Sequence, residues 1–120
     1  MSTTEMVVHS SAELLARAVA ARLVTRMVDA QAAYGSASVV LTGGRTGTQV
    51  LRELRVAPAR DAVDWRRVDV WWGDERFVLA DDPRRNERQA REALLDHVPV
   101  DPVRVHRMPA AVEHFGHDAA

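Results

Sequence analysis

The spacing of apolar residues predicts a long amphipathic helix in the first third of the chain. A short apolar run at residues 6–8 precedes it and is typical of a β-strand. Ser10 followed by Glu13 has the capping-box pattern of a helix start, and Gly35 suits a C-terminal cap. The apolar face expected between them repeats every four residues and consists of Leu15, Val19, Leu23 and Met27.

Strands and helices are predicted to alternate along the rest of the chain. Runs rich in valine and tryptophan predict strands at residues 38–42, 68–72 and 103–106. A helix is expected to start near Thr46, and another covers residues 86–98. This order predicts an α/β fold with a mostly parallel sheet and helices on both faces, a Rossmann-like arrangement in three layers.

A glycine-rich loop follows the strand predicted at residues 38–42. Free N–H groups at the start of a helix attract anions, and glycine allows an anion to approach the backbone. The loop could therefore hold a phosphate through Gly43, Gly44, Arg45 and Thr46. A tight strand-to-helix turn also needs glycine for structural reasons alone, so both interpretations stay open. The loop lacks the lysine of a P-loop and the spacing of a dinucleotide-binding fingerprint.

A charged loop, Asp74-Glu75-Arg76, follows the strand predicted at residues 68–72. Neighbouring residues at a strand end point in different directions, so Asp74 and Arg76 can share a side while Glu75 faces elsewhere. Asp74 could bind sugar hydroxyls or orient a catalytic base, and Arg76 could hold a phosphate through its two-pronged guanidinium. The alternative is a surface ion pair of little energetic value. Ligands of parallel sheets bind where strands end, which favours a binding site.

Composition narrows the function further. A chain of 120 residues suits one domain, and its formal net charge of −1 argues against a nucleic-acid-binding protein. It has no cysteine, and all 16 basic residues are arginine, which excludes thiolate and lysine chemistry. Glu5 and His9 interrupt any signal peptide, and no run of 18 apolar residues could cross a membrane. From these two absences we expect a cytoplasmic protein. No histidine pair has the spacing of a zinc hydrolase, so we expect no metal.

Several motifs together resemble the 6-phosphogluconolactonase family in their order and spacing, over about residues 7–109. They are residues 40–47, Asp64-Trp65, residues 70–78, Asp81-Asp82 and Asn86. Glucosamine-6-phosphate deaminases share the fold and the glycine loop, but they carry Asp-Glu-Tyr where this chain has Asp-Glu-Arg. They resemble the chain less for that reason.

The resemblance implies hydrolysis of 6-phospho-D-glucono-1,5-lactone to 6-phosphogluconate in the oxidative pentose phosphate pathway. It implies no cofactor and no metal, because a histidine activates water for attack on the lactone carbonyl. The partner is a small sugar-phosphate lactone, with no nucleic acid or membrane. Asp74 would support catalysis. The residues that would bind the substrate and its phosphate are Gly43, Gly44, Arg45, Thr46, Arg76 and Asn86.

The chain departs from the family pattern at three places. Gly47 stands where the family has proline, and Arg85 stands where it has serine before the asparagine. The family's catalytic histidine lies in a Gly-x-Gly-x-Asp-Gly-His-Thr segment, which is missing. His117 follows the strand predicted at residues 103–106 too soon to replace it, with no helix between them.

We therefore expect residues 1–120 to be the N-terminal part of a single α/β domain, truncated before the catalytic histidine and inactive by itself. Two alternatives remain for the function. One is a non-catalytic module that binds sugar phosphates, and the other is an isomerase like glucosamine-6-phosphate deaminase.

Overall fold

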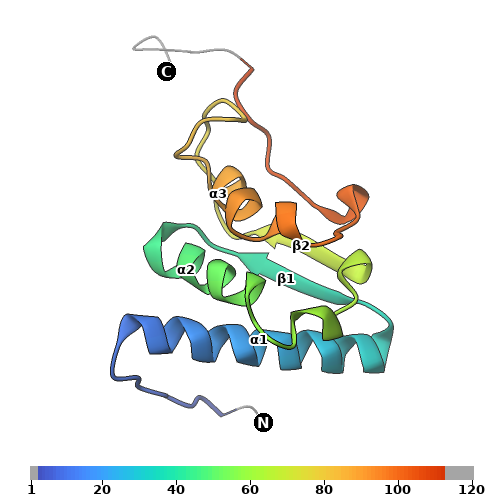
Figure 1. The fold of residues 1–120 in the computed structure, drawn as a ribbon. Helices are drawn as coiled ribbons and strands as arrows, with labels where there is room; N and C mark the ends of the chain where they lie inside the picture. The colour runs from blue at the N-terminus through green and yellow to red at the C-terminus, as the bar shows by residue number, and fades with distance from the viewer. Residues whose placement is uncertain (1–2, 113–120) are drawn as a thin grey trace.

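The computed structural model describes residues 3–112, which form three α-helices and two parallel strands (Figure 1). Short 3-10 turns lie between these elements at Arg60–Ala62, Trp65–Arg67, Leu95–His97 and Pro102–Arg104. In chain order the helices and strands are α1 (Ala12–Tyr34), β1 (Ala37–Leu41), α2 (Gly44–Arg55), β2 (Val68–Trp72) and α3 (Asn86–Ala93).

The first helix, α1, has the ends that its sequence favours, with a shift of one residue at its start. The hydroxyl of Ser11, and not that of Ser10, accepts the Leu14 N–H at 3.1 Å. Gly35 ends the helix with a φ of 81°, which glycine adopts without steric cost. The most buried face is also shifted from the predicted one, and two of its four residues are alanine: it consists of Ala16, Ala20, Val24 and Met27. Small side chains there allow the close packing of α1 on α2.

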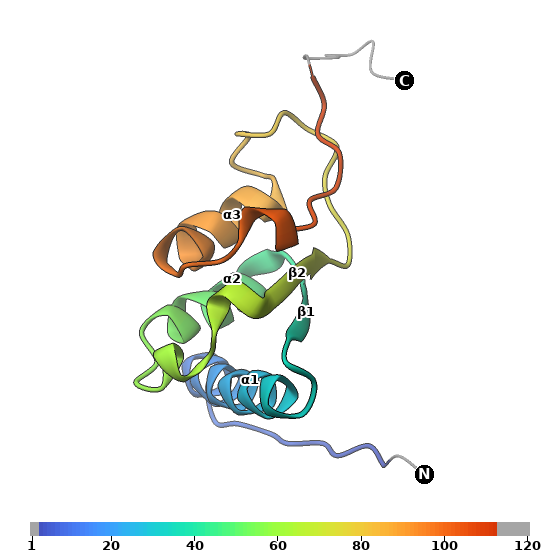
Figure 2. The same cartoon turned by 90° about the vertical axis from the view of Figure 1, so that its right-hand side faces the viewer.

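The two strands pair in parallel, from Ala37 opposite Val68 to Leu41 opposite Trp72. Alternation along each strand sends Leu41 and Val70 into the core, where they meet leucines of α2 such as Leu51. Figure 2 shows α2 and α3 together on one side of the two strands. The opposite face is only partly covered within residues 3–112. Its paired neighbours Val40 and Trp71 are 62% and 45% exposed, although His106 stacks on Trp71.

The α/β class and the parallel sheet are confirmed, and two of the predicted strands are corrected. Residues 6–8 form no strand and are largely exposed. Residues 103–106 give only one parallel bridge, between Val105 and Val70, with the His106 N–H donating to the Val70 carbonyl at 2.8 Å. A 3-10 turn replaces the start of that strand, because the Asp101 side chain accepts the N–H of Val103 and Pro102 lies between them.

Two helix boundaries also differ from the predicted ones. The second helix begins at Gly44 rather than near Thr46. The third ends at Ala93, because Leu94 leaves the helical region with φ −144° and a 3-10 turn follows. No helix within residues 3–112 combines the length and the apolar character needed to cross a membrane. The segment around His117 lies outside the described residues.

Candidate functional site

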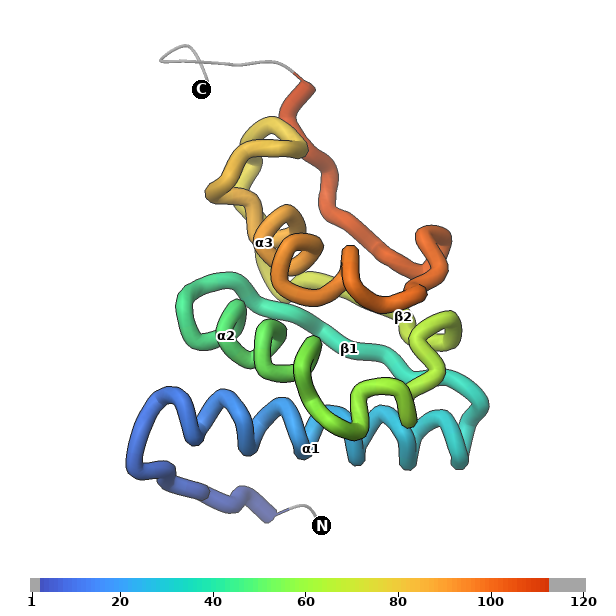
Figure 3. The backbone as a smooth tube through the Cα atoms, viewed as in Figure 1, coloured from blue at the N-terminus to red at the C-terminus, as the bar shows by residue number. Residues whose placement is uncertain are grey.

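The loops that follow β1 and β2 lie side by side, as the parallel arrangement predicts. The Gly73 N–H donates to the Leu41 carbonyl at 3.0 Å, which continues the strand pairing by one residue. From there residues 73–85 leave the sheet and return to it at the start of α3 (Figure 3). The glycine loop, the charged loop and the first turn of α3 therefore meet at one edge of the sheet.

The glycine loop needs glycine at two positions, for two different reasons. Gly44 has a φ of 89°, in the left-handed region that other residues rarely adopt. Gly43 has an ordinary φ, but a Cβ there would lie 2.0 Å from Oδ1 of Asn86. Neither glycine can cap α2 with a side chain, so the first N–H groups of that helix have no side-chain cap.

A groove of about 690 Å³ runs between α2 and α3 next to this loop. It brings together three of the residues predicted for the site: Gly44, Arg45 and Arg76. The other lining residues are Thr48, Arg52, Arg55, Gln89, Glu92 and Ala93. With four arginines and one glutamate, the lining favours an anionic ligand.

Arg52 and Arg55 were missed by the sequence analysis, although the sequence contains a signal for them. Arg45, Arg52 and Arg55 are spaced at i, i+7 and i+10, which places them on one face of α2. A periodicity search restricted to apolar residues does not find such a polar face.

Arg76 is oriented by the loop that follows it. Its Nη1 donates to the Arg84 carbonyl at 3.1 Å. The Arg84 guanidinium in turn donates twice to the Asp82 carboxylate, at 3.0 and 2.8 Å. That hydrogen bonding, followed by the carboxylate's negative charge, raises the pKa of Arg84. A guanidinium has five N–H donors, so one bond to a carbonyl leaves Arg76 able to bind a phosphate.

Asn86 joins the charged loop to the glycine loop. It is buried at the first position of α3, and its Nδ2 donates to the Asp74 carbonyl at 3.3 Å. Its side chain fills the space above Gly43. Asn86 therefore holds the ends of β1 and β2 together.

The other predicted residues lie around the groove rather than in its lining. Asp74 is exposed on the charged loop, and its carbonyl, as described, accepts from Asn86. Thr46 lines a separate hollow between α2 and the start of α1, with Glu13 and Gln49. No group of three or more metal-ligating side chains occurs within residues 3–112.

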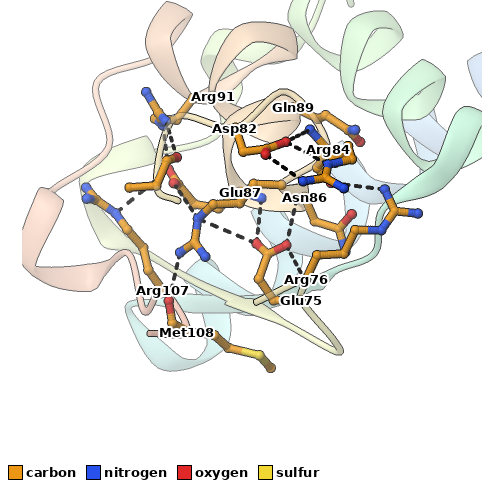
Figure 4. Close-up of polar contacts among 12 residues, drawn as sticks. Glu75, Arg76, Asp82, Arg84, Asn86, Glu87, Gln89, Arg91, Arg107 and Met108 are labelled. Carbon is orange, nitrogen blue, oxygen red and sulfur yellow. Dashed lines mark hydrogen bonds and ion pairs between the residues drawn. The ribbon is translucent and has the colours of Figure 1, made fainter. Parts of the chain in front are cut away.

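The Glu75 side chain is buried, so it does not belong to the surface ion pair considered for this loop. This side chain (Figure 4) is only 3% exposed. Nε of the equally buried Arg85 lies 4.0 Å from its Oε2. Oε1 accepts the N–H groups of Arg76 and Asn86, at 2.8 and 2.7 Å. Oε2 accepts the N–H of Glu87 at 2.8 Å.

The fold is a parallel α/β sheet with a cationic groove beyond its strand ends, which is where open α/β proteins bind their ligands. Residues 10–120 match the family described as glucosamine-6-phosphate isomerases/6-phosphogluconolactonase. The chain belongs to this family.

Curated relatives agree with this assignment. The chain is 60% identical to the 6-phosphogluconolactonase of Streptomyces coelicolor over 97% of its own length, and 41% identical to that of Mycobacterium tuberculosis over 92%. In both cases it spans 44% of the relative's length.

Solved structures give the same result. A 6-phosphogluconolactonase from Shewanella baltica matches 78% of the chain with a TM-score of 0.67 at 29% identity. The enzyme from Thermotoga maritima matches 76% with a TM-score of 0.67 at 27% identity. The chain covers 40% of each of these structures.

Proposed function

We propose that this chain supplies the sugar-phosphate-binding part of a 6-phosphogluconolactonase, which hydrolyses 6-phospho-D-glucono-1,5-lactone to 6-phosphogluconate. The observation that carries the proposal is the groove in which Arg45 and Arg76 meet the glycine loop at the carboxyl edge of the sheet. The family's relatives named as lactonases support the choice of substrate.

In this proposal each part of the site has a distinct role. Arg76 and Arg45 bind the phosphate, and the N–H groups around Gly43 and Gly44 add donors without occupying space. Thr46 lies in the first turn of α2 but lines the neighbouring hollow, so it is not assigned to the groove. Asp74, exposed on the charged loop, is assigned to the sugar and supports catalysis, and Asn86 holds that loop in place.

The reaction itself needs a base that activates water. We assign that role to a histidine of the segment typical of the family, which is absent from these 120 residues. The arginines then serve binding and the orientation of the lactone, while the bond-breaking step depends on a group supplied from elsewhere in the enzyme.

Replacing Arg76 with alanine is expected to weaken binding of 6-phosphogluconate about tenfold or more, because a charge-assisted hydrogen bond to the phosphate is lost. Calorimetry with the 120-residue chain measures this. The matched control is Arg66→Ala, since Arg66 is exposed on a 3-10 turn outside the groove lining. Equal loss in both variants would indicate non-specific attraction and contradict the proposal.

A lactonase assay on the same chain separates the remaining alternatives. We expect no hydrolysis above the spontaneous rate of the lactone, together with measurable binding of 6-phosphogluconate. Hydrolysis by the chain would place the catalytic base within these residues. Turnover of glucosamine 6-phosphate would favour the isomerase branch of the family, which Arg76 argues against.

A further inference from the structure

We propose that Glu75 is a positioning residue, which fixes Arg76 and Asn86 at the groove through their backbone N–H groups. The relevance of this role to ligand binding rests on the function proposed above. The geometry is independent of that function, because it consists of three hydrogen bonds within the chain.

Both carboxylate oxygens of Glu75 are used by the backbone. Oε1 accepts the N–H of Arg76, the next residue in the chain, and the N–H of Asn86, which lies 11 positions after Glu75. Oε2 accepts from Glu87. Arg85, the N-cap residue of α3, makes no capping bond with its side chain, so Glu75 caps this helix from the preceding loop. One carboxylate thus sets the backbone of a groove residue and the start of α3 together.

Arg85 places positive charge beside the buried carboxylates of Glu75 and Glu87. Its guanidinium Nε lies 4.0 Å from Oε2 of Glu75 and 3.5 Å from Oε1 of Glu87. Within the described residues Nε and Nη1 form no hydrogen bond, and Nη2 donates to the Met108 carbonyl at 2.7 Å. Arg85 therefore supplies positive charge without occupying the oxygens of Glu75, which stay available to the three N–H donors.

Glu87 provides a matched comparison within the same cluster. It is buried to the same 3% and also faces Arg85. Its carboxylate pairs instead with the side chains of Arg91 and Arg107, at 2.6 and 3.8 Å, and takes no N–H from Arg76 or Asn86. If burial and ion pairing alone mattered, substitution of either glutamate should weaken ligand binding equally. If Glu75 positions the groove, only its substitution should weaken binding.

The test compares Glu75→Gln with Glu87→Gln in the 120-residue chain. Glutamine keeps the length of the side chain but offers one acceptor oxygen, so Glu75→Gln cannot hold all three N–H groups. We expect it to weaken 6-phosphogluconate binding about tenfold, whereas Glu87→Gln changes it less than about twofold. Equal losses in the two variants, or no loss in Glu75→Gln, would overturn the proposal.

Amide NMR gives a second readout that needs no ligand. In the unsubstituted chain the Arg76 N–H, although its residue is exposed, should exchange slowly with solvent because it is bonded to Glu75. Glu75→Gln should shift the amide signals of Asn86 and Glu87, which are distant from it in sequence, and Glu87→Gln should leave the signal of Arg76 in place. Fast exchange of the Arg76 amide in the unsubstituted chain would overturn the proposal even if Glu75→Gln fails to fold.

The two readouts also keep this inference separate from the proposed function. Slow exchange and the expected shifts, with no binding of 6-phosphogluconate to the unsubstituted chain, would support the positioning role and contradict the proposed function. Binding that is lost in Arg76→Ala but unchanged in Glu75→Gln would support the proposed function and contradict the positioning role.

Discussion

Arg85→Met is expected to lower the free energy of unfolding by about 3 kcal/mol, a large share of the stability of a small domain. Arg85 is 2% exposed, and its removal leaves Glu75 and Glu87 buried without the charge that lies between them. It also removes the hydrogen bond to the Met108 carbonyl, which holds the C-terminal part of the described chain against α3. Urea denaturation followed by circular dichroism measures the change.

The adjacent arginine is the natural control for this substitution. Arg84 pairs with Asp82 at 2.8 Å, but its side chain is 66% exposed, and its contact with Arg76 is made by its carbonyl. Arg84→Met should therefore leave the urea midpoint nearly unchanged. A small effect in Arg85→Met, equal to that of Arg84→Met, would show that the cost of burying Arg85 cancels its pairing.

Gly43→Ala is expected to destabilise the chain by about 2 kcal/mol and to weaken ligand binding as well. The new methyl group would lie 2.0 Å from Oδ1 and 2.4 Å from Cγ of Asn86. The Asn86 side chain would have to move, and its hydrogen bond to the Asp74 carbonyl would break. Thermal unfolding and 6-phosphogluconate titration measure the two effects.

A double substitution isolates the cause of this loss. In Asn86→Ala the atoms that would collide with the new methyl group are absent, so Gly43→Ala added to it should be neutral or slightly stabilising. The backbone of residue 43 has a φ of −82°, which alanine accepts without strain. If the two substitutions were simply additive, the contact between Gly43 and Asn86 would not be the reason for the glycine.

The fold was predictable where a pattern within one segment decides the structure. Helix α1 begins and ends near its predicted caps, and valine runs locate β1 and β2 within a residue or two. The start of the strand predicted at residues 103–106 was lost because the cap of Asp101 and Pro102 outweighs the valines that follow. The apolar run at residues 6–8 has no strand to pair with among the described residues, and three residues cannot form one by themselves.

The site likewise has a part that the sequence predicts and a part that it does not. Parallel strands bring their carboxyl ends together, which is why Gly44, Arg45 and Arg76 could be expected at one edge. The burial of Glu75 could not, because its three donors come from the turn of the chain between residues 76 and 87. Alternation within a strand gives the direction of a side chain only while the strand continues, and β2 ends at Trp72.

The arginines of the groove make the molecule electrically uneven. Its formal net charge is −1, yet four of its arginines gather around one groove with a single glutamate. The remaining surface therefore carries an excess of negative charge, which repels phosphorylated molecules that approach from other directions. Such a field speeds association at low ionic strength and fades as salt shortens the screening length to about 8 Å at physiological concentration. Capture of a sugar phosphate should thus slow with added salt, while its release changes less.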